Sequence, residues 1–269
     1  MSTVRHPAVA GRFYPARPDI LLHDVQSYLV DGATKMEALG CVAPHAGYMY
    51  SGHVAGAVYA RLALPQRFII LCPNHTGMGA PLAIMSEGAW STPLGEVAID
   101  HELAMQLRNT YHQISEDTAA HRMEHALEVQ LPFLQALRRD FQFVPITVGV
   151  GSYDPLSALG EALARVILAQ KEKVLIIASS DMNHYESDAI TRTKDSKAIE
   201  QMLALDPRGL YDVVMREEIS MCGYGPTIAM LTAAKRLGAK SADLVKYATS
   251  ADVSGDRDTV VGYAGIVVH

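Results

Sequence analysis

The amino-acid sequence predicts a single α/β domain with a mostly parallel or mixed sheet and helices on both of its faces. Short apolar runs alternate along the chain with longer amphipathic runs, which is typical of strands connected by helices. The apolar runs lack a polar face, as expected for strands that helices cover on both sides. No repeat or low-complexity linker divides the 269 residues, so we expect one domain over residues 1–269.

The expected strands are short and rich in Ile and Val, and they are Leu39–Ala43, Phe68–Cys72, Leu82–Met85, Phe143–Val148, Val174–Ala178 and Val260–Val268. The expected helices have helical spacing of apolar residues, and they are Asp19–Val30, His53–Leu64, His101–Asn109, Met123–Arg139, Pro155–Gln170, Ala189–Leu205 and Pro226–Leu237. Pro132 should kink or split its helix, because proline lacks an amide donor and clashes one turn back. The last strand alternates less cleanly and could be an antiparallel edge strand.

The composition predicts a soluble cytoplasmic protein that binds neither nucleic acid nor a membrane. The chain has 49% hydrophobic residues, 19% charged residues and a net charge of −6, without a run of Lys and Arg that would attract an anionic duplex. No apolar stretch is long enough to span a bilayer, and the N-terminus lacks the apolar core of a signal peptide. Three cysteines are too few for a disulfide framework, which favours a reducing compartment.

Three of the expected strands are followed by polar clusters that contain His45, His75, and the pair Asp181 and His184. Ligands of open α/β sheets bind beyond the carboxyl ends of the strands, where these clusters should meet. A lone histidine at a strand end is usually a hydrogen-bonded loop residue. However, His45 and His75 each have a proline within the two preceding residues and a glycine two residues later. Neutral imidazole is also the commonest metal ligand among side chains. This repetition indicates a functional site.

Cys222 is the third candidate ligand. It lies among turn residues just before the expected helix Pro226–Leu237, where the helix dipole favours a thiolate. A free cysteine is more often a small buried hydrophobic residue. Cys41 and Cys72 fit that description because they lie inside apolar strands, whereas Cys222 does not.

Asp181 and His184 form an Asp-x-x-His sequence after a strand. The carboxylate could orient the imidazole or support a metal ligand, and the histidine could act as a general acid or base. Alternatively, Asp181 could cap a helix. The spacing alone leaves both interpretations open.

The segment Glu124-His125-x-x-Glu128 resembles a metal-binding motif superficially, but it is not His-Glu-x-x-His. Its two carboxylates are four residues apart and would share one face of a helix. Such a pattern is more often the solvated, charged edge of a surface helix, and we expect that here.

Several motifs in sequence order resemble those of the Memo family, namely Arg5–Pro15, Ala43–Tyr48, Glu124–Phe133, Ser179–Tyr185, Cys222–Gly223 and Tyr247–Asp256. The resemblance covers essentially the whole chain and implies the fold of the class III extradiol dioxygenases, non-haem iron enzymes that cleave catechol rings. It implies that His45, His75 and Cys222 stand where those enzymes hold iron with two histidines and a glutamate. It also places Asp181 and His184 beside the pocket, with His184 near the acid/base histidine.

The exchange of a carboxylate for Cys222 softens the donor set, so copper or zinc would suit it as well as iron. The resemblance further implies a pathway link to a radical SAM protein, beside which prokaryotic members are often encoded. The eukaryotic member is associated with cell-motility signalling, phosphotyrosine-peptide binding and copper- or iron-linked redox chemistry.

Three functions are compatible with these residues. The first is a metal-dependent oxidoreductase for a small substrate, in which His45, His75 and Cys222 bind iron or copper and His184, oriented by Asp181, moves a proton. The second is a module that binds a metal or peptide without turnover on a dioxygenase-like fold. The third is a zinc hydrolase that uses His184 as its general base.

Overall fold

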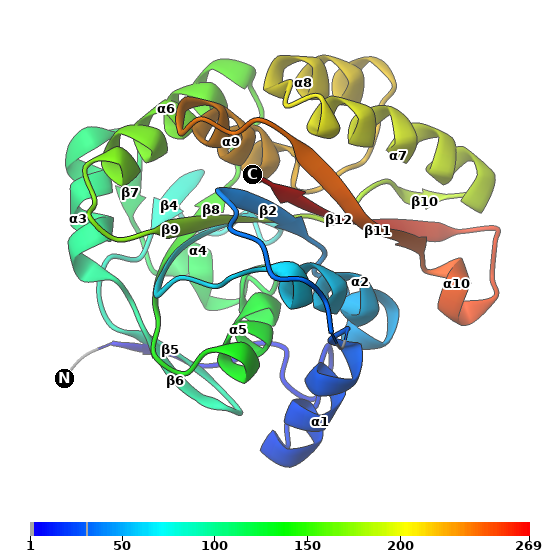
Figure 1. Ribbon diagram of the computed structural model, residues 1–269, viewed down its shortest axis with the longest axis horizontal. Helices are drawn as coiled ribbons and strands as arrows, with labels where there is room; N and C mark the ends of the chain where they lie inside the picture. Colours follow the sequence, from blue (N-terminus) through cyan, green and yellow to red (C-terminus); the bar gives the residue numbers. More distant parts are fainter. Residues whose placement is uncertain (1–2, 31) are drawn as a thin grey trace.

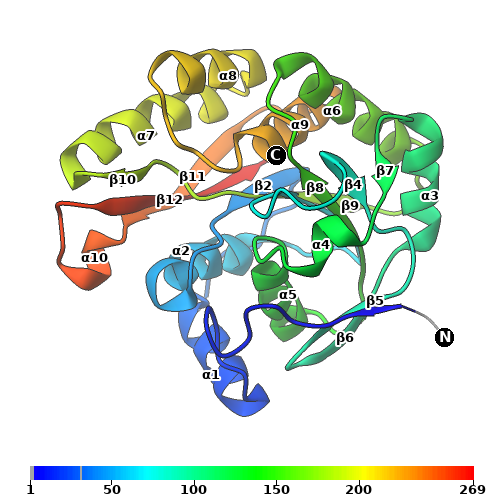
Figure 2. The ribbon, with the colours of Figure 1, turned by 180° about the vertical axis from the view of Figure 1, so that it is seen from behind.

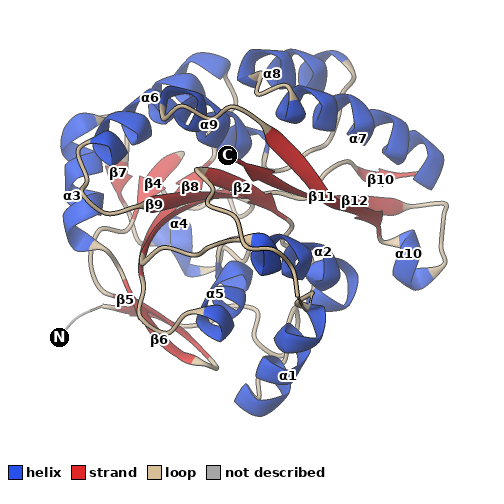
Figure 3. Ribbon diagram, in the orientation of Figure 1, coloured by secondary structure: helices blue, strands red, loops and turns tan. Residues whose placement is uncertain are grey.

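A nine-stranded mixed sheet forms the centre of the molecule, and helices cover both of its faces (Figure 1, Figure 3). The computed structural model describes residues 3–30 and 32–269. The strands of this sheet are β2 (Gly40–Ala43), β3 (Arg67–Pro73), β4 (Leu82–Ile84), β7 (Ser115–Glu116), β8 (Gln142–Val148), β9 (Val174–Ser179), β10 (His184–Glu186), β11 (Ala242–Thr249) and β12 (Val260–Val268). Their order is β10-β12-β2-β9-β3-β8-β4-β7, and β11 pairs with β12 outside this path.

The middle of the sheet is parallel. Strands β2, β9, β3 and β8 all run in one direction, so their carboxyl ends lie at the same edge. Strand β12 pairs antiparallel with β2, as expected for the last stretch of the chain. It is not an edge strand, however, because β10 and β11 also pair with it. The predicted fold class is thus confirmed, with antiparallel strands added on both sides of a parallel centre.

The helices are α1 (Pro18–Tyr28), α2 (Tyr48–Arg61), α3 (His101–Thr110), α4 (Ala119–Arg122), α5 (Leu131–Leu137), α6 (Tyr153–Leu168), α7 (Asp188–Leu203), α8 (Pro207–Arg216), α9 (Tyr224–Arg236) and α10 (Ala251–Ser254). Helices α3, α6, α7, α8 and α9 lie on one face of the sheet, and α1, α2 and α5 lie on the other (Figure 1, Figure 2). A small sheet of β1 (Val4–Arg5), β5 (Ala89–Thr92) and β6 (Gly95–Ala98) lies below the second face. Within the described part of the chain, none of the helices has the length and apolar character that crossing a bilayer requires.

The central sheet separates two hydrophobic cores, and β3 contributes to both. Ile69 and Leu71 belong to the core under α6 and α9, whereas Phe68 and Ile70 belong to the core over α2 and α5. All four side chains are fully buried. Strands that are covered on both sides need apolar residues at every position, which is why these strands read as continuous apolar runs.

The helix expected over Met123–Arg139 is shorter than predicted. The chain first forms turns, then a single 3-10 turn at Glu128–Gln130, and α5 begins only at Leu131. Pro132 lies in the first turn of α5, where its missing amide donor costs nothing. Pro132 therefore lies at the start of a short helix instead of kinking or splitting a longer one, and the helical conformation expected for residues 123–127 is wrong.

Candidate metal centre

His45 and His75 meet at the carboxyl edge of the parallel strands. His45 follows β2 and His75 follows β3, with β9 between those two strands. The centroids of the two imidazole rings are 5.2 Å apart, and the rings are nearly perpendicular. Because the strands are parallel, their ends bring together two residues that are thirty positions apart in the sequence.

A third histidine, His125, joins this pair. Its ring centroid lies 5.5 Å from that of His45 and 4.7 Å from that of His75. One ring nitrogen of each of the three histidines lies within 4.8 Å of the others, so the group could hold a metal ion. His125 is in the turns between α4 and α5, a segment expected to be helical.

The carboxylates on either side of His125 are not at a solvated edge, contrary to expectation. Glu124 and Glu128 are both fully buried. The sequence did contain a signal of burial, because apolar residues occupy most of the positions around them, namely Ala126, Leu127, Val129 and Leu131. Carboxylates in such a setting need internal donors, which these two find in distant parts of the chain.

Glu124 positions His75. One carboxylate oxygen, Oε1, lies 2.9 Å from His75 Nδ1, and the other accepts the backbone N–H of His75 at 2.6 Å. Burial raises the pKa of Glu124, but the hydrogen bond and charge of His75, the backbone N–H of Ala126 and the charge of His125 together outweigh burial, so the net pKa is lowered. Burial lowers the pKa of His75, but the bond to Glu124 and its charge outweigh burial, so the net pKa is raised. Because a carboxylate accepts the Nδ1 proton, His75 Nε2 is free to bind a ligand.

His45 is held by two groups at the end of β9. Its Nδ1 lies 2.9 Å from Ser179 Oγ, and its backbone N–H donates to Asp181 Oδ1 at 2.7 Å. Burial, followed by the charges of the neighbouring histidines, lowers the pKa of His45 well below its ordinary value. The imidazole is therefore neutral at neutral pH, which is the form that binds metals.

Cys222 lies directly against His45. Its Sγ is 3.2 Å from His45 Nε2, and the residue precedes Gly223, the N-cap of α9. The position before a helix predicts a lowered thiol pKa, but burial and then the charge of Asp181 raise the pKa of Cys222 well above its ordinary value. The protein alone therefore keeps this thiol protonated. A cation in the site would reverse that preference.

Asp181 neither orients the imidazole of His184 nor caps a helix, two of the roles that the sequence left open for it. Asp181 binds the backbone of His45, while His184 Nδ1 lies 2.8 Å from the carbonyl oxygen of Ser220. Helix α7 is capped by Ser187 rather than by Asp181. Burial raises the pKa of Asp181 to about 7, although the backbone N–H of His45 opposes this. Burial lowers the pKa of His184.

A hollow of about 220 Å³ adjoins this group of residues. Both His75 and Cys222 line it, and the rest of its lining is uncharged: Pro73, Asn74, Val148, Gly149, Val150, Gly151, Tyr224, Gly225 and Pro226. Small residues line much of it, which leaves room for a ligand near the imidazole and the thiol. The hollow fits a small molecule rather than a folded partner.

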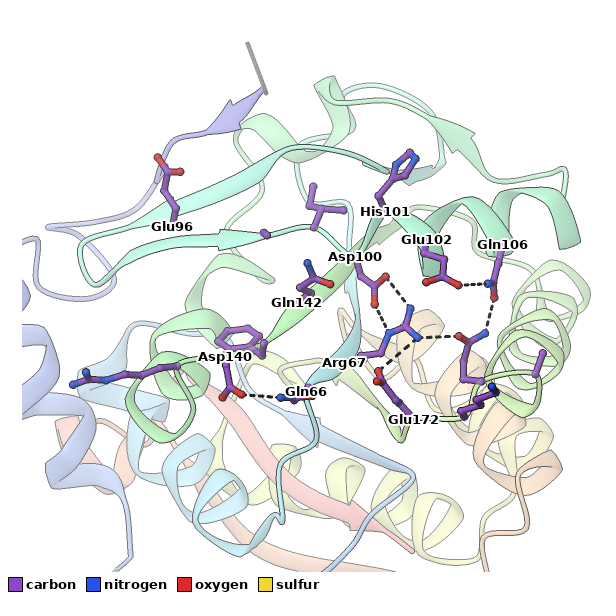
Figure 4. A pocket seen from close by; sticks show the side chains of 17 residues that line it. Gln66, Arg67, Glu96, Asp100, His101, Glu102, Gln106, Asp140, Gln142 and Glu172 are labelled. Atoms are coloured by element: carbon purple, nitrogen blue, oxygen red, sulfur yellow. Dashed lines mark hydrogen bonds and ion pairs between the residues drawn. The ribbon is translucent and has the colours of Figure 1, made fainter.

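A larger hollow, of about 1110 Å³, lies at the opposite end of the parallel strands (Figure 4). Arg67 at the start of β3 binds both oxygens of Asp100, at 2.6 and 2.9 Å. Its Nη1 donates to Gln170 Oε1 at 2.9 Å. Figure 4 shows the side chains of Arg67 and Asp100 directed toward one another.

The fold and these residues define an α/β protein with a candidate metal centre at the carboxyl edge of its sheet. A family model described as "Memo-like protein" matches residues 5–267. The chain is 46% identical to a MEMO1 family protein of Methanosarcina mazei, with 99% of both chains covered. It is 44% identical to a MEMO1 family protein of Archaeoglobus fulgidus, with 98% of this chain and 99% of that one covered. The chain therefore belongs to the Memo family.

One solved structure resembles this fold at low sequence identity. It is the uncharacterized protein JW3007 from Escherichia coli K12, with a TM-score of 0.52 and 13% identity, and the match covers 85% of this chain and 98% of that one. This likeness extends to the fold alone. The expected likeness to the class III extradiol dioxygenases stays a prediction.

Proposed function

We propose that the protein is a metal-dependent oxidoreductase for a small substrate, in which His45, His75 and Cys222 bind iron or copper. The close approach of the ring nitrogens of His45 and His75 supports the proposal most strongly. Cys222 Sγ lies 3.2 Å from His45 Nε2, and it lines the same hollow as His75. A metal at this position would therefore face a space that accommodates a small molecule.

The donor set suits a redox metal. Two imidazoles and a thiolate match iron and copper, and zinc also accepts them. Metal-binding histidines usually donate their second ring N–H to a carboxylate or another acceptor, and His45 and His75 both have such a partner at Nδ1. When bound, an iron or copper ion with an open position supplies the electron-transfer chemistry that the side chains lack.

His184 is the proposed proton-transfer residue. The carbonyl oxygen of Ser220 accepts its Nδ1 proton, which leaves Nε2 free to take up a proton from a substrate. Burial lowers its pKa, so the imidazole is neutral and can act as a base. His184 is close enough that its charge would lower the pKa of His45. Asp181 has a supporting role, because it fixes the backbone of His45.

His125 is the other candidate for the third ligand, since its ring nitrogen lies within 4.8 Å of those of His45 and His75. Its Nδ1 is 3.5 Å from Glu124 Oε1, a looser contact than the one that holds His75. Only a thiolate ligand would give a sulfur-to-metal charge-transfer absorption. Loss of that absorption in Cys222→Ala, and its persistence in His125→Ala, would favour Cys222.

Elemental analysis of purified protein tests the proposal, with His45→Ala and Cys222→Ala as the informative variants. His101→Ala and Cys41→Ala are matched controls, because His101 lines the hollow at the other end of the strands and Cys41 lies inside β2. We expect near-stoichiometric iron or copper that both informative variants lose and both controls keep. Metal-loaded protein should consume oxygen when given an electron donor. Zinc with the same pattern would favour a hydrolase, and protein that takes up no metal after reconstitution would contradict the proposal.

A non-catalytic binding module is the second candidate function. A hollow of about 460 Å³ lies beside the centre, lined in part by Arg12, Phe13, Tyr28 and Tyr50. Phe13 connects the two places, because its ring centroid is 4.7 Å from that of His125. Aromatic rings and a guanidinium suit a peptide ligand. Saturable peptide binding that survives removal of the metal would favour this function.

The link to a radical SAM protein and the cytoplasmic location stay predictions.

A further inference from the structure

The hydroxyl of Ser179 lies at a junction of three hydrogen bonds behind His45. Ser179 ends β9 and is fully buried. Its Oγ lies 2.6 Å from the carbonyl oxygen of Ala126, 2.8 Å from Gln130 Nε2 and 2.9 Å from His45 Nδ1. A serine hydroxyl has one proton and two lone pairs, so these three contacts use its whole hydrogen-bonding capacity.

The orientation of Gln130 follows from its other neighbours. The atom that faces the carbonyl oxygen of Pro44, at 3.0 Å, must be the amide nitrogen, because a carbonyl oxygen only accepts. On the opposite side, Gln130 Oε1 accepts the hydroxyl proton of Tyr59 at 2.8 Å. Gln130 is fully buried, so no solvent competes for these groups. The amide nitrogen that faces Ser179 is therefore a donor.

The proton positions around Ser179 are then determined. Ser179 donates its only proton to the carbonyl oxygen of Ala126, which can only accept. One lone pair of Oγ accepts from Gln130, and the other faces His45 Nδ1. Nδ1 must therefore carry a proton, and the lone pair of the imidazole lies on Nε2, which points toward Cys222.

We infer that Ser179 and Gln130 are positioning residues that fix the tautomer of His45 so that Nε2 is ready to bind a metal. This inference rests on the metal site proposed above. The opposite tautomer would place two lone pairs against each other at a 2.9 Å separation. His45 is 2% exposed, so water cannot relieve that arrangement. The site is thus prepared before a metal arrives, which reduces the cost of binding.

Nitrogen-15 NMR of the histidine rings in metal-free protein tests the inference, together with the dissociation constant for Zn(II). In wild type we expect His45 to be protonated at Nδ1. In Ser179→Ala the opposite tautomer is no longer penalised, so it should become populated, and Zn(II) should bind about 10–100-fold more weakly. Gln130→Met keeps the Ser179 hydroxyl but removes the donor that faces it, together with the bonds of Gln130 to Pro44 and Tyr59, and its effect on the His45 tautomer should be smaller.

Thr147→Val is the matched control. Thr147 is fully buried in β8, and its hydroxyl has no hydrogen-bond partner among the described residues. This variant should change neither the tautomer nor the Zn(II) affinity. A wild-type His45 protonated at Nε2, or a Ser179→Ala protein with wild-type tautomer and affinity, would overturn the inference, and so would equal effects of Thr147→Val and Ser179→Ala.

The two measurements also separate this inference from the proposed function. The tautomer is read in metal-free protein, so it supports or overturns the role of Ser179 even where wild type binds no metal. Absence of metal binding in wild type would overturn the proposed function instead. Gln130→Met provides the same readout where Ser179→Ala does not fold.

Discussion

The two ends of the parallel strands both contain charged and polar side chains, but these side chains are used differently. At the amino end, Arg67 and Asp100 satisfy each other beside a hollow of about 1110 Å³ (Figure 4). At the carboxyl end, the hollow is about 220 Å³. His45 and His75 there each form a hydrogen bond through Nδ1 with another side chain, and each has a ring nitrogen close to the other candidate metal ligands. Ring nitrogens that are available to a metal, rather than volume, therefore distinguish the candidate site.

The type of hydrogen-bond partner explains this difference. A guanidinium and a carboxylate match in shape and charge, and Arg67 also binds Gln170 while Asp100 also accepts the N–H of Leu103, so the pair leaves little capacity for a ligand. An imidazole bound at Nδ1 by an acceptor keeps a lone pair on Nε2, as in His45 and His75. Hydrogen bonding between buried polar groups thus occupies the side chains at the amino end of the strands, whereas at the carboxyl end it leaves imidazole lone pairs that can bind a metal.

The largest expected effect concerns Glu128, which anchors the N-terminal segment beside the candidate metal centre. Its carboxylate forms a buried ion pair with Arg5 and accepts the hydroxyl of Tyr14 at 2.5 Å and the backbone N–H of Ala8 at 2.8 Å. Glu128→Gln leaves the Arg5 charge buried without a counter-charge. We expect the free energy of unfolding, measured by urea denaturation, to fall by about 3–5 kcal/mol.

Asp100→Asn is the matched change at the amino end. Arg67 is 12% exposed and lies 4.0 Å from Glu172, so it keeps some solvent and a second carboxylate. The loss should be about 1–3 kcal/mol. A larger loss for Asp100→Asn than for Glu128→Gln would contradict the view that the carboxyl end has the more deeply buried charges.

The second effect concerns metal affinity. Three donors converge on the carboxylate of Glu124: Nδ1 and the backbone N–H of His75, and the backbone N–H of Ala126. Glu124→Gln places an amide nitrogen, which cannot accept, against at least one of them. The dissociation constant for Zn(II) should rise about 10–100-fold. Glu102→Gln, in the hollow at the amino end, is the control and should leave it unchanged.

The third effect is a pH dependence of stability. Asp195 binds the hydroxyl of Tyr247 and the backbone N–H of Asn183, whereas Asp100 binds a guanidinium. Burial raises the pKa of Asp195 from 3.8 to about 7. Between these two pH values the folded protein holds a proton on Asp195 that the unfolded chain releases. The contribution of Asp195 to stability is therefore fully present below pH 3.8 and is lost as the pH rises through about 7.

Asp195→Asn should remove this dependence. Because other groups titrate in the same range, the useful quantity is the difference in unfolding free energy between the variant and wild type. That difference should move by about 1–2 kcal/mol in favour of the variant between about pH 5 and about pH 6.5. A difference that stays constant over this range would show that Asp195 has an ordinary pKa.

The smallest effect is expected for His101→Ala at the amino end. His101 is the first residue of α3, and its Nδ1 lies 2.9 Å from the carbonyl oxygen of Ser86. Loss of this partly exposed hydrogen bond should lower the free energy of unfolding by about 1 kcal/mol and leave Zn(II) affinity as in wild type. A marked loss of affinity would place a metal ligand at the wrong end of the sheet.

The sequence was sufficient for the parts of the site that depend on local patterns. Apolar runs predicted the parallel strands, and the strand ends placed His45 and His75 at one edge. The pairing of Glu128 with Arg5 could not be predicted in this way, because the two residues are 123 positions apart. The same limit applies to His184: Asp181 is near in sequence, but the partner in space is Ser220, which lies 36 positions further along.

The most direct test of the metal centre is a Co(II) titration of metal-free protein followed by optical absorption, with wild type, His45→Ala, Cys222→Ala and the control His101→Ala. We predict one Co(II) per chain with a thiolate-to-metal charge-transfer band in wild type and in His101→Ala. His45→Ala should bind much more weakly, and Cys222→Ala should lose the band. Unchanged binding in His45→Ala, or no stoichiometric binding in wild type, would contradict a metal centre at the carboxyl end of the sheet.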